Sequence, residues 1–221
     1  DETGPWLRLE GVHDFNMLGS TVQDDGRLEC EVTARLRSAG AAWSRLRQTL
    51  FSGSVLGPRR KYTLFTTFVL SRLLLYACET WRLDSSELRR LQRFYDRCLR
   101  HLAGHTGWTV WQQRVSYHSI RAILGAPHFR NLLDRRCLMW AGHVARMSST
   151  RIPLQQLTGD TSNWPRDTTR KTFYRYSQRV SEALRNYSIN SRLFFDAAHD
   201  AGRWREHIHR GWRHPGAAGA G

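Results

Sequence analysis

Apolar residues recur at the spacing of an α-helix through much of this 221-residue chain, and this periodicity limits the fold more than any other feature. In residues 29–51 the apolar positions are Val32, Leu36, Trp43, Leu46 and Leu50. After Asp84 and Ser85, either of which could cap a helix, they are Leu88, Leu91, Tyr95 and Leu99. Such spacing places one apolar stripe on each helix, ready to be buried in a core. The sequence therefore predicts a mainly α fold.

The same reasoning divides the rest of the chain. It predicts helices over residues 59–77, 116–124, 128–147 and 169–186, from 191, and around Trp204 and Ile208. Ser116 is a candidate cap for the helix over 116–124. Only Phe15–Val22, interrupted by Gly19, is typical of a strand and a turn. We expect an N-terminal extension with this strand and turn (1–28), a helical domain (29–147), a linker (148–168), a C-terminal helical segment (169–213) and a flexible tail (214–221).

The net charge is the strongest clue to a partner. It is +15 at pH 7, the isoelectric point is about 10.9, and only Lys61 and Lys171 are lysines. Such a charge favours polyanions, with nucleic acid ahead of an anionic membrane. Arginine binds phosphate with two parallel hydrogen bonds, although a GC-rich genome would also enrich it. No apolar run is long enough to span a membrane; the best, residues 62–77, contains Arg72.

Basic residues form three clusters that we predict to bind RNA. The first, on the predicted helix 85–103, comprises Arg89, Arg90, Arg93, Arg97 and Arg100. Like charges four residues apart destabilise a helix, and a polyanion would offset that repulsion; the alternative is a solvated face. The second comprises Arg130, Arg135, Arg136 and Arg146. The third interleaves Arg166, Arg170, Lys171, Arg175 and Arg179 with Phe173, Tyr174 and Tyr176, which suits looped or single-stranded RNA.

Two other groups of residues invite a chemical interpretation. Cys98, His101 and His105 could share a helix face and bind zinc, but Gly104 should end the helix first, and structural zinc sites usually pair close ligands. We therefore predict neither a metal nor a cofactor.

The segment LMWAGHVARM (138–147) allows two interpretations of His143. Either His143 is functional, or the segment is structural. In the second case Trp140 and Val144 pack inward, Gly142 permits close helix approach, and His143 donates one hydrogen bond. Four cysteines without a CxxC pair predict reduced thiols and an intracellular, reducing compartment.

Six segments, in order, resemble the region downstream of the palm in non-LTR (LINE-like) retrotransposon reverse transcriptases. They are FNMLGSTVQDDG (15–26), LLYACETW (74–81), RFYDRCLRHLAG (93–104), RCLMWAGHVARM (136–147), RIPLQQL (151–157) and DAGRWREHI (200–208). The resemblance implies that Leu18, Gly19 and Ser20 correspond to the primer grip. It also implies that the helices over 29–103 form a thumb-like bundle and its extension.

The resemblance also implies that the catalytic palm would lie upstream of residue 15. The only paired aspartates are Asp24 and Asp25, in a polar turn, whereas two-metal phosphoryl transfer needs carboxylates on rigid elements. We expect a non-catalytic RNA-binding protein in a ribonucleoprotein with other proteins, such as an organellar ribosome. The mitochondrion is the favoured location, and the nucleus or cytoplasm is the alternative. The alternatives are a fragment of an active reverse transcriptase polyprotein that grips template and primer, and a basic accessory subunit of a protein or membrane complex.

Overall fold

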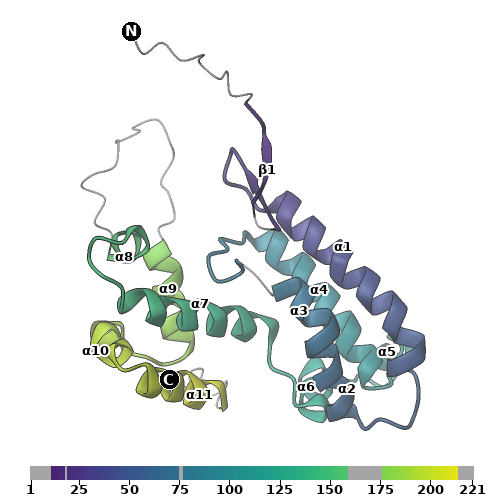
Figure 1. Cartoon of the computed structure of the whole chain (residues 1–221). Coiled ribbons are helices and arrows are strands. Elements are labelled where there is room, and N and C mark those ends of the chain that lie inside the picture. The colour runs from purple at the N-terminus through teal and green to yellow at the C-terminus, as the bar shows by residue number, and fades with distance from the viewer. Residues whose placement is uncertain (1–10, 18, 75–76, 159–175, 214–221) are drawn as a thin grey trace.

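The computed structural model describes residues 11–17, 19–74, 77–158 and 176–213, and these are mainly helical with one short strand pair (Figure 1). The predicted fold class is thus confirmed. The first helices are α1 (Glu29–Leu46), α2 (Pro58–Phe65), α3 (Ser71–Leu74), α4 (Ser85–Leu102), α5 (Gly107–Gln112) and α6 (Tyr117–Leu124). They are followed by α7 (Phe129–Ala145), α8 (Ile152–Thr158), α9 (Tyr176–Asn186), α10 (Phe194–His199) and α11 (Ala201–Arg213). Among the described residues, no helix combines the length and apolarity needed to cross a bilayer.

The N-terminal strands form a hairpin. Strand β1 (Asp14–Met17) pairs antiparallel with β2 (Ser20–Gln23), with Phe15 opposite Val22. Phe15, Met17 and Val22 each remain more than half exposed. A two-stranded hairpin is marginally stable alone, so its position depends on polar contacts between Glu31 and Arg35 of α1 and the backbone of Gly19 and Thr21.

The first apolar core lies among α1, α2, α3, α4, α6 and the beginning of α7. Its centre is a chain of aromatic contacts in which Tyr95 lies 6.2 Å from Phe65 and 5.4 Å from Phe129, between ring centroids. The buried hydroxyl of Tyr95 is satisfied, because it lies 3.0 Å from the Tyr62 hydroxyl and donates to the carbonyl of Pro127 at 3.0 Å. Tyr95 therefore fixes α4 against both α2 and α7.

Helix α4 begins where a local signal in the sequence places it. The Asp84 carboxylate accepts hydrogen bonds from the backbone N–H groups of Ser86 and Glu87, both at 2.7 Å, and Glu87 accepts from the Asp84 N–H at 2.8 Å. This reciprocal capping box satisfies donors that the first helical turn leaves free. Of the two caps that the sequence allowed, Asp84 rather than Ser85 is used. Ser116 caps α6 as predicted, by accepting from Ser119 N–H at 3.1 Å.

The second apolar core joins the later half of α7 to α8, α9, α10 and α11. Helix α7 belongs to both cores, because Leu133 packs in the first and Cys137 in the second. In Figure 1, α7 accordingly runs from the first group of helices into the second. The closest approach in the second core is made by the fully buried indole of Trp204, which lies on the backbone of Gly142 and donates to the carbonyl of Leu138 at 2.9 Å.

Several helix limits differ from those predicted. The segment predicted as one helix over 59–77 is α2, a π-helical turn over Thr66–Leu70 and α3, which ends at Leu74. Helix α8 lies in the predicted linker; its proline stands in the first turn, where a missing N–H is tolerated. Helix α5 was not predicted because six residues, beginning with glycine, are too few to show a periodicity.

Candidate nucleic-acid interface

Three of the five arginines in the first cluster form an exposed row on α4. Arg89, Arg93 and Arg97 follow one another at intervals of four residues, and all three side chains are exposed. The opposite side of the helix is fully buried at Leu91, where it faces the first core. Residues four apart on a helix have Cβ atoms about 5–6 Å from each other. A rigid helix therefore presents three guanidinium groups along one line, which we call the α4 arginine row.

The carboxylates near this row are engaged elsewhere. Residues 29–133 contain 17 Lys and Arg against 6 Asp and Glu. Five of these six acids are held in caps, ion pairs or hydrogen bonds within the fold: Glu31, Glu79, Asp84, Glu87 and Asp96. None of the three arginines of the row forms an ion pair with a carboxylate in the described part of the chain. The row is therefore a region of positive charge that no carboxylate of the described residues neutralises by an ion pair.

The other two arginines of this cluster, Arg90 and Arg100, contact other elements of the fold. The guanidinium of Arg90 donates to the hydroxyl of Thr33 on α1 at 2.8 Å. That of Arg100 lies beside Gly107, at the start of α5, 3.7 Å from the position that a Cβ there would take. More cations gather at this end of α4. The pKa of the neighbouring His101 lies below its ordinary value of 6.5. Burial is the largest cause, and the positive charges of Arg47, Lys61 and Arg100 lower it further.

The second arginine cluster is not a free surface, because most of its members bind protein groups. Arg130 pairs with Glu182 at 3.4 Å and Arg136 with Glu79 at 3.3 Å. Arg146 donates to the carbonyl of Ala198 at 2.6 Å. These contacts tie α7 to α9, to the loop before α4 and to α10. Arg135 is exposed and also has an interaction of its own.

The third cluster lies mostly outside the described residues, including Arg166, Arg170, Lys171, Phe173, Tyr174 and Arg175. Its described members face the protein. Arg179, only 14% exposed, pairs with the fully buried Asp134 at 2.7 Å. Asp134 also accepts from the Asn186 side chain at 2.7 Å, so this buried group links α7 to α9. Tyr176 is half-buried, and burial raises its pKa. These residues hold the second core together.

A groove of about 690 Å³ separates the α2–α3 segment from α7. Its lining includes Tyr62, Arg135, Arg136, Trp140 and His143. His143 is exposed there, with its ring centroid 5.3 Å from that of Trp140, and it forms no side-chain hydrogen bond with a described residue. Of the packing that we predicted, Val144 is fully buried and Trp140 half-buried, whereas His143 does not donate the expected hydrogen bond to any residue that the structure describes.

The weak zinc candidate does not assemble. The Cys98 thiol is fully buried in the first core, and burial raises its pKa. His101 instead lies edge-on to Trp43, with ring centroids 5.5 Å apart, and contacts the Ser52 hydroxyl at 3.5 Å. Within the described residues, no three His, Cys, Asp or Glu side chains come together to hold a metal ion.

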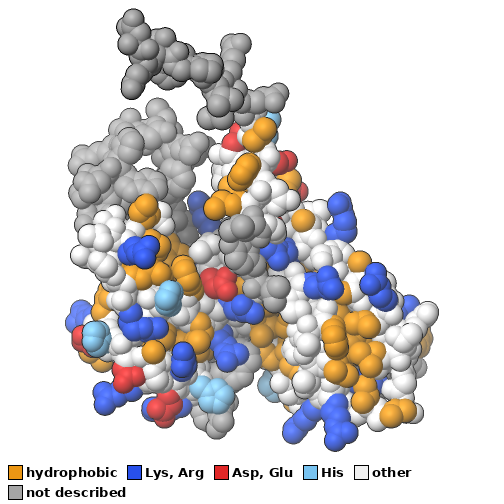
Figure 2. Space-filling model, viewed as in Figure 1, with side chains coloured by type: hydrophobic (Ala, Val, Ile, Leu, Met, Phe, Trp, Pro, Cys, Tyr) orange, Lys and Arg blue, Asp and Glu red, His pale blue; other side chains and the backbone are white. Residues whose placement is uncertain are grey.

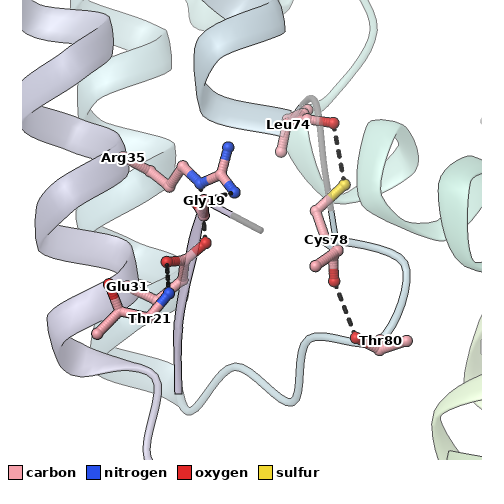
Figure 3. Close-up of polar contacts among 8 residues, drawn as sticks. Gly19, Thr21, Glu31, Arg35, Leu74, Cys78 and Thr80 are labelled. Carbon is pink, nitrogen blue, oxygen red and sulfur yellow. Dashed lines mark hydrogen bonds and ion pairs between the residues drawn. The ribbon is translucent and has the colours of Figure 1, made fainter. Parts of the chain in front are cut away.

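The turn that resembles a primer grip is bound to α1 (Figure 3). Gly19 adopts a φ of 82°, which suits glycine, and its carbonyl accepts from Arg35 at 3.3 Å. The buried Glu31 accepts from the backbone N–H of Thr21 at 2.7 Å and pairs with Arg35 at 2.8 Å. Ser20 begins β2, and Leu18 lies outside the described residues. The hairpin is therefore held at a fixed place on α1 by a buried carboxylate and its arginine.

The paired aspartates after the hairpin are engaged locally. Asp24 lies 2.9 Å from the His13 ring, which lowers the pKa of Asp24 and raises that of His13. Asp25 pairs with Arg27 at 3.3 Å and accepts from its backbone N–H. These side chains stabilise the turn, and they do not meet a third acid among the described residues.

One exposed feature was missed by the sequence analysis. On α5, Trp108 and Trp111 are 65% and 73% exposed, with ring centroids 5.3 Å apart and planes inclined by 35°. The signal was present in GWTVWQQR, where two tryptophans stand three residues apart among polar neighbours. Large exposed aromatic side chains are uncommon away from binding sites.

The chain is similar to a Caenorhabditis elegans protein described as an uncharacterised transposon-derived protein. The two are 26% identical over 159 residues, which is 72% of this chain and 56% of that protein. The chain thus spans about half the length of the curated relative that it matches. No family model matches the chain, and no solved structure matches it. This similarity is consistent with an origin in a transposon.

Proposed function

We propose that this protein binds RNA by its sugar-phosphate backbone, with the α4 arginine row as the main contact surface. One observation carries the proposal: Arg89, Arg93 and Arg97 stand exposed on one line of a rigid helix while the nearby carboxylates are engaged elsewhere. Guanidinium groups bind phosphate through charge-assisted, often bidentate, hydrogen bonds. A bound phosphate chain would also relieve the repulsion between arginines four residues apart.

The fold supplies what a backbone-binding helix needs. Contacts to phosphates hold a nucleic acid in register without reading its sequence, so they require cations at fixed positions. The capping box at Asp84 and the buried Tyr95 fix the start and the middle of α4. The positive charge also extends beyond α4. Figure 2 shows several blue side chains and almost no red ones below the hairpin on the visible face of α1–α6.

The proposal extends to the origin and setting of the protein. The transposon-derived relative and the six segments that resemble a reverse transcriptase favour descent from its thumb region. We propose that the chain has no polymerase activity of its own, because Asp24 and Asp25 are engaged with His13 and Arg27 in an exposed turn. We place it in a ribonucleoprotein such as an organellar ribosome, with the mitochondrion favoured. The four free cysteines agree with a reducing compartment.

A second candidate function is favoured by the hairpin and the length of the relative. Phe15, Met17 and Val22 leave one face of the hairpin apolar and more than half exposed, and the match covers only 56% of the relative. In a longer chain, this face could pack on a polymerase while α4 grips template and primer. Primer extension by a longer chain, abolished by charge reversal on α4, would favour this second function.

The test of the proposed function is RNA binding by the variant Arg93→Glu/Arg97→Glu across a range of salt concentrations. Each phosphate contact contributes about 0.7–0.9 to the slope of log affinity against log salt. We expect at least a tenfold loss of affinity at low salt and a slope smaller by about 1.4 or more. The matched control is Arg151→Glu/Arg192→Glu, which changes the net charge equally at two exposed positions outside α4. Equal binding by the two variants would exclude the α4 arginine row as the contact surface.

A further inference from the structure

We propose that Trp108 and Trp111 form a stacking platform for the unpaired bases of a nucleic-acid strand whose backbone lies on the α4 arginine row. This inference rests on the proposed function and narrows its ligand to single-stranded or looped RNA. Two observations carry it: the exposure of two neighbouring indoles, and their position at the end of the row.

The indoles are presented by a helix that is itself anchored. The residue between them that faces the protein, Val110, packs against the first core. Its N–H donates to the carbonyl of Thr106 at 3.2 Å, and its carbonyl accepts from Val115 N–H at 3.1 Å. The backbone that carries the two rings is therefore fixed, while the rings project from it. Pre-ordered rings lose little conformational freedom when a flat ligand binds them.

The platform continues the arginine row in space. Helix α5 begins five residues after α4 ends, and Figure 1 places it beside the C-terminal end of α4. The connection is short and held, because the N–H of His105 donates to the carbonyl of Arg100 at 3.0 Å. The guanidinium of Arg100 lies beside Gly107, the residue immediately before Trp108. A strand that follows Arg89, Arg93 and Arg97 thus arrives at the two indoles.

Charge and shape together select the ligand class. The cations require an anionic partner, and the two indoles offer flat apolar faces. A single strand meets both demands, since its phosphates repeat along the chain and each of its unpaired bases has a face to stack. An acidic peptide would neutralise the arginines but would leave the rings without a flat partner. A duplex would bind the arginines while hiding its base faces within the helix.

The test compares two fluorescein-labelled probes, a 20-nucleotide oligouridine strand and a 20-base-pair RNA duplex. Alanine substitution of a stacking aromatic lowers affinity by a factor of about 5 to 150 per base. For Trp108→Ala/Trp111→Ala we expect at least a tenfold loss of affinity for the single strand and less than a twofold change for the duplex. The slope of affinity against salt should not change, because no cation has been removed.

Two further variants make the result specific. Trp108→Phe/Trp111→Phe keeps a flat face at each position and should retain most of the affinity for the single strand. Phe195→Ala is the matched control, because that ring is 46% exposed and belongs to α10 in the second core. It should bind both probes as the unmodified chain does. Circular dichroism should show that each variant keeps its helical content.

Unchanged single-strand affinity in the alanine variant would overturn the inference, and so would equal losses for strand and duplex. The first result would mean that the rings bind another partner, such as a protein. Failure of the stacking platform can be distinguished from failure of the proposed function, because the variant Arg93→Glu/Arg97→Glu tests the proposed function separately. If charge reversal weakens RNA binding and the tryptophan variant does not, the α4 arginine row is supported as the contact surface and the stacking platform is refuted.

Discussion

Replacing Gly142 by alanine should destabilise the second core, although alanine is the better helix former. A Cβ at this position would approach three atoms of the Trp204 indole more closely than 3.0 Å, including Nε1 and Cδ1. The indole cannot simply turn away, since it is only 1% exposed and its N–H donates to the carbonyl of Leu138. Both partners are rigid, namely the backbone of α7 and a fused ring.

The magnitude follows from three contributions. Overpacking a filled core destabilises by about 1–3 kcal/mol. Leaving the indole N–H without its acceptor costs about 1–3 kcal/mol more. Helix propensity returns about 1 kcal/mol in favour of alanine. We therefore expect Gly142→Ala to lower the free energy of unfolding by about 1–5 kcal/mol.

Urea denaturation monitored by circular dichroism measures this loss, and hydrogen exchange should show the earliest opening in α11. The matched control is Gly40→Ala on α1. It is also a glycine inside a long helix, but a Cβ there would meet nothing within 4 Å. That variant should be as stable as the unmodified chain, or more stable by up to about 1 kcal/mol. If Gly142→Ala behaves like Gly40→Ala, the close approach of Trp204 does not exist as described.

Three further perturbations test other contacts. Asp134→Ala leaves Arg179 buried without its partner, and thermal unfolding should reveal a loss of about 3–5 kcal/mol. Burial is the largest cause of the lowered pKa values of His101 and His128, so the unfolded chain binds these protons more readily. Stability should consequently fall as pH drops below 6.5, and urea midpoints measured between pH 7.5 and 5.5 should fall less when both histidines are replaced by asparagine. Asp84→Ala removes the capping box of α4 and should lower stability by about 0.5–2 kcal/mol in urea denaturation; an unchanged midpoint would show that the cap contributes nothing.

The sequence predicts the helices whose signals are local. The stripe of α4, its cap at Asp84 and the cap of α6 at Ser116 all lie within a few residues of the helix that they define. Helices α5 and α8 escape such reasoning because six or seven residues hold too few apolar positions to establish a period. Because α5 could not be predicted, the exposed pair of indoles that it carries, Trp108 and Trp111, was not predicted either.

Partners distant in the sequence cannot be predicted in this way. The sequence shows that Arg130, Arg136 and Arg179 are cations, but their carboxylates stand 45 to 57 residues away and become neighbours only in the fold. These arginines, which the sequence suggests as RNA contacts, therefore form ion pairs between elements of the fold. The arginines of the α4 row form no such pairs with described residues, because the nearest acids cap α4 or pair with other side chains.

Gly142 shows an intermediate case. Its small size predicted a close approach between helices, and the structure confirms that approach. The identity of the approaching side chain, Trp204, required the fold. Two of the segments that resemble a reverse transcriptase, residues 136–147 and 200–208, therefore meet in one packing contact. His143, in the first of these segments, is left exposed at the groove beside α7.

The central claim is that RNA lies along α4 and reaches α5. Ultraviolet crosslinking of the protein to single-stranded RNA, followed by mass spectrometry of the linked peptides, tests this claim most directly. We predict that crosslinked peptides map to residues 89–114, with Trp108 and Trp111 among the modified positions. Crosslinks confined to α9, α10 and α11, with none on α4 or α5, would contradict the claim.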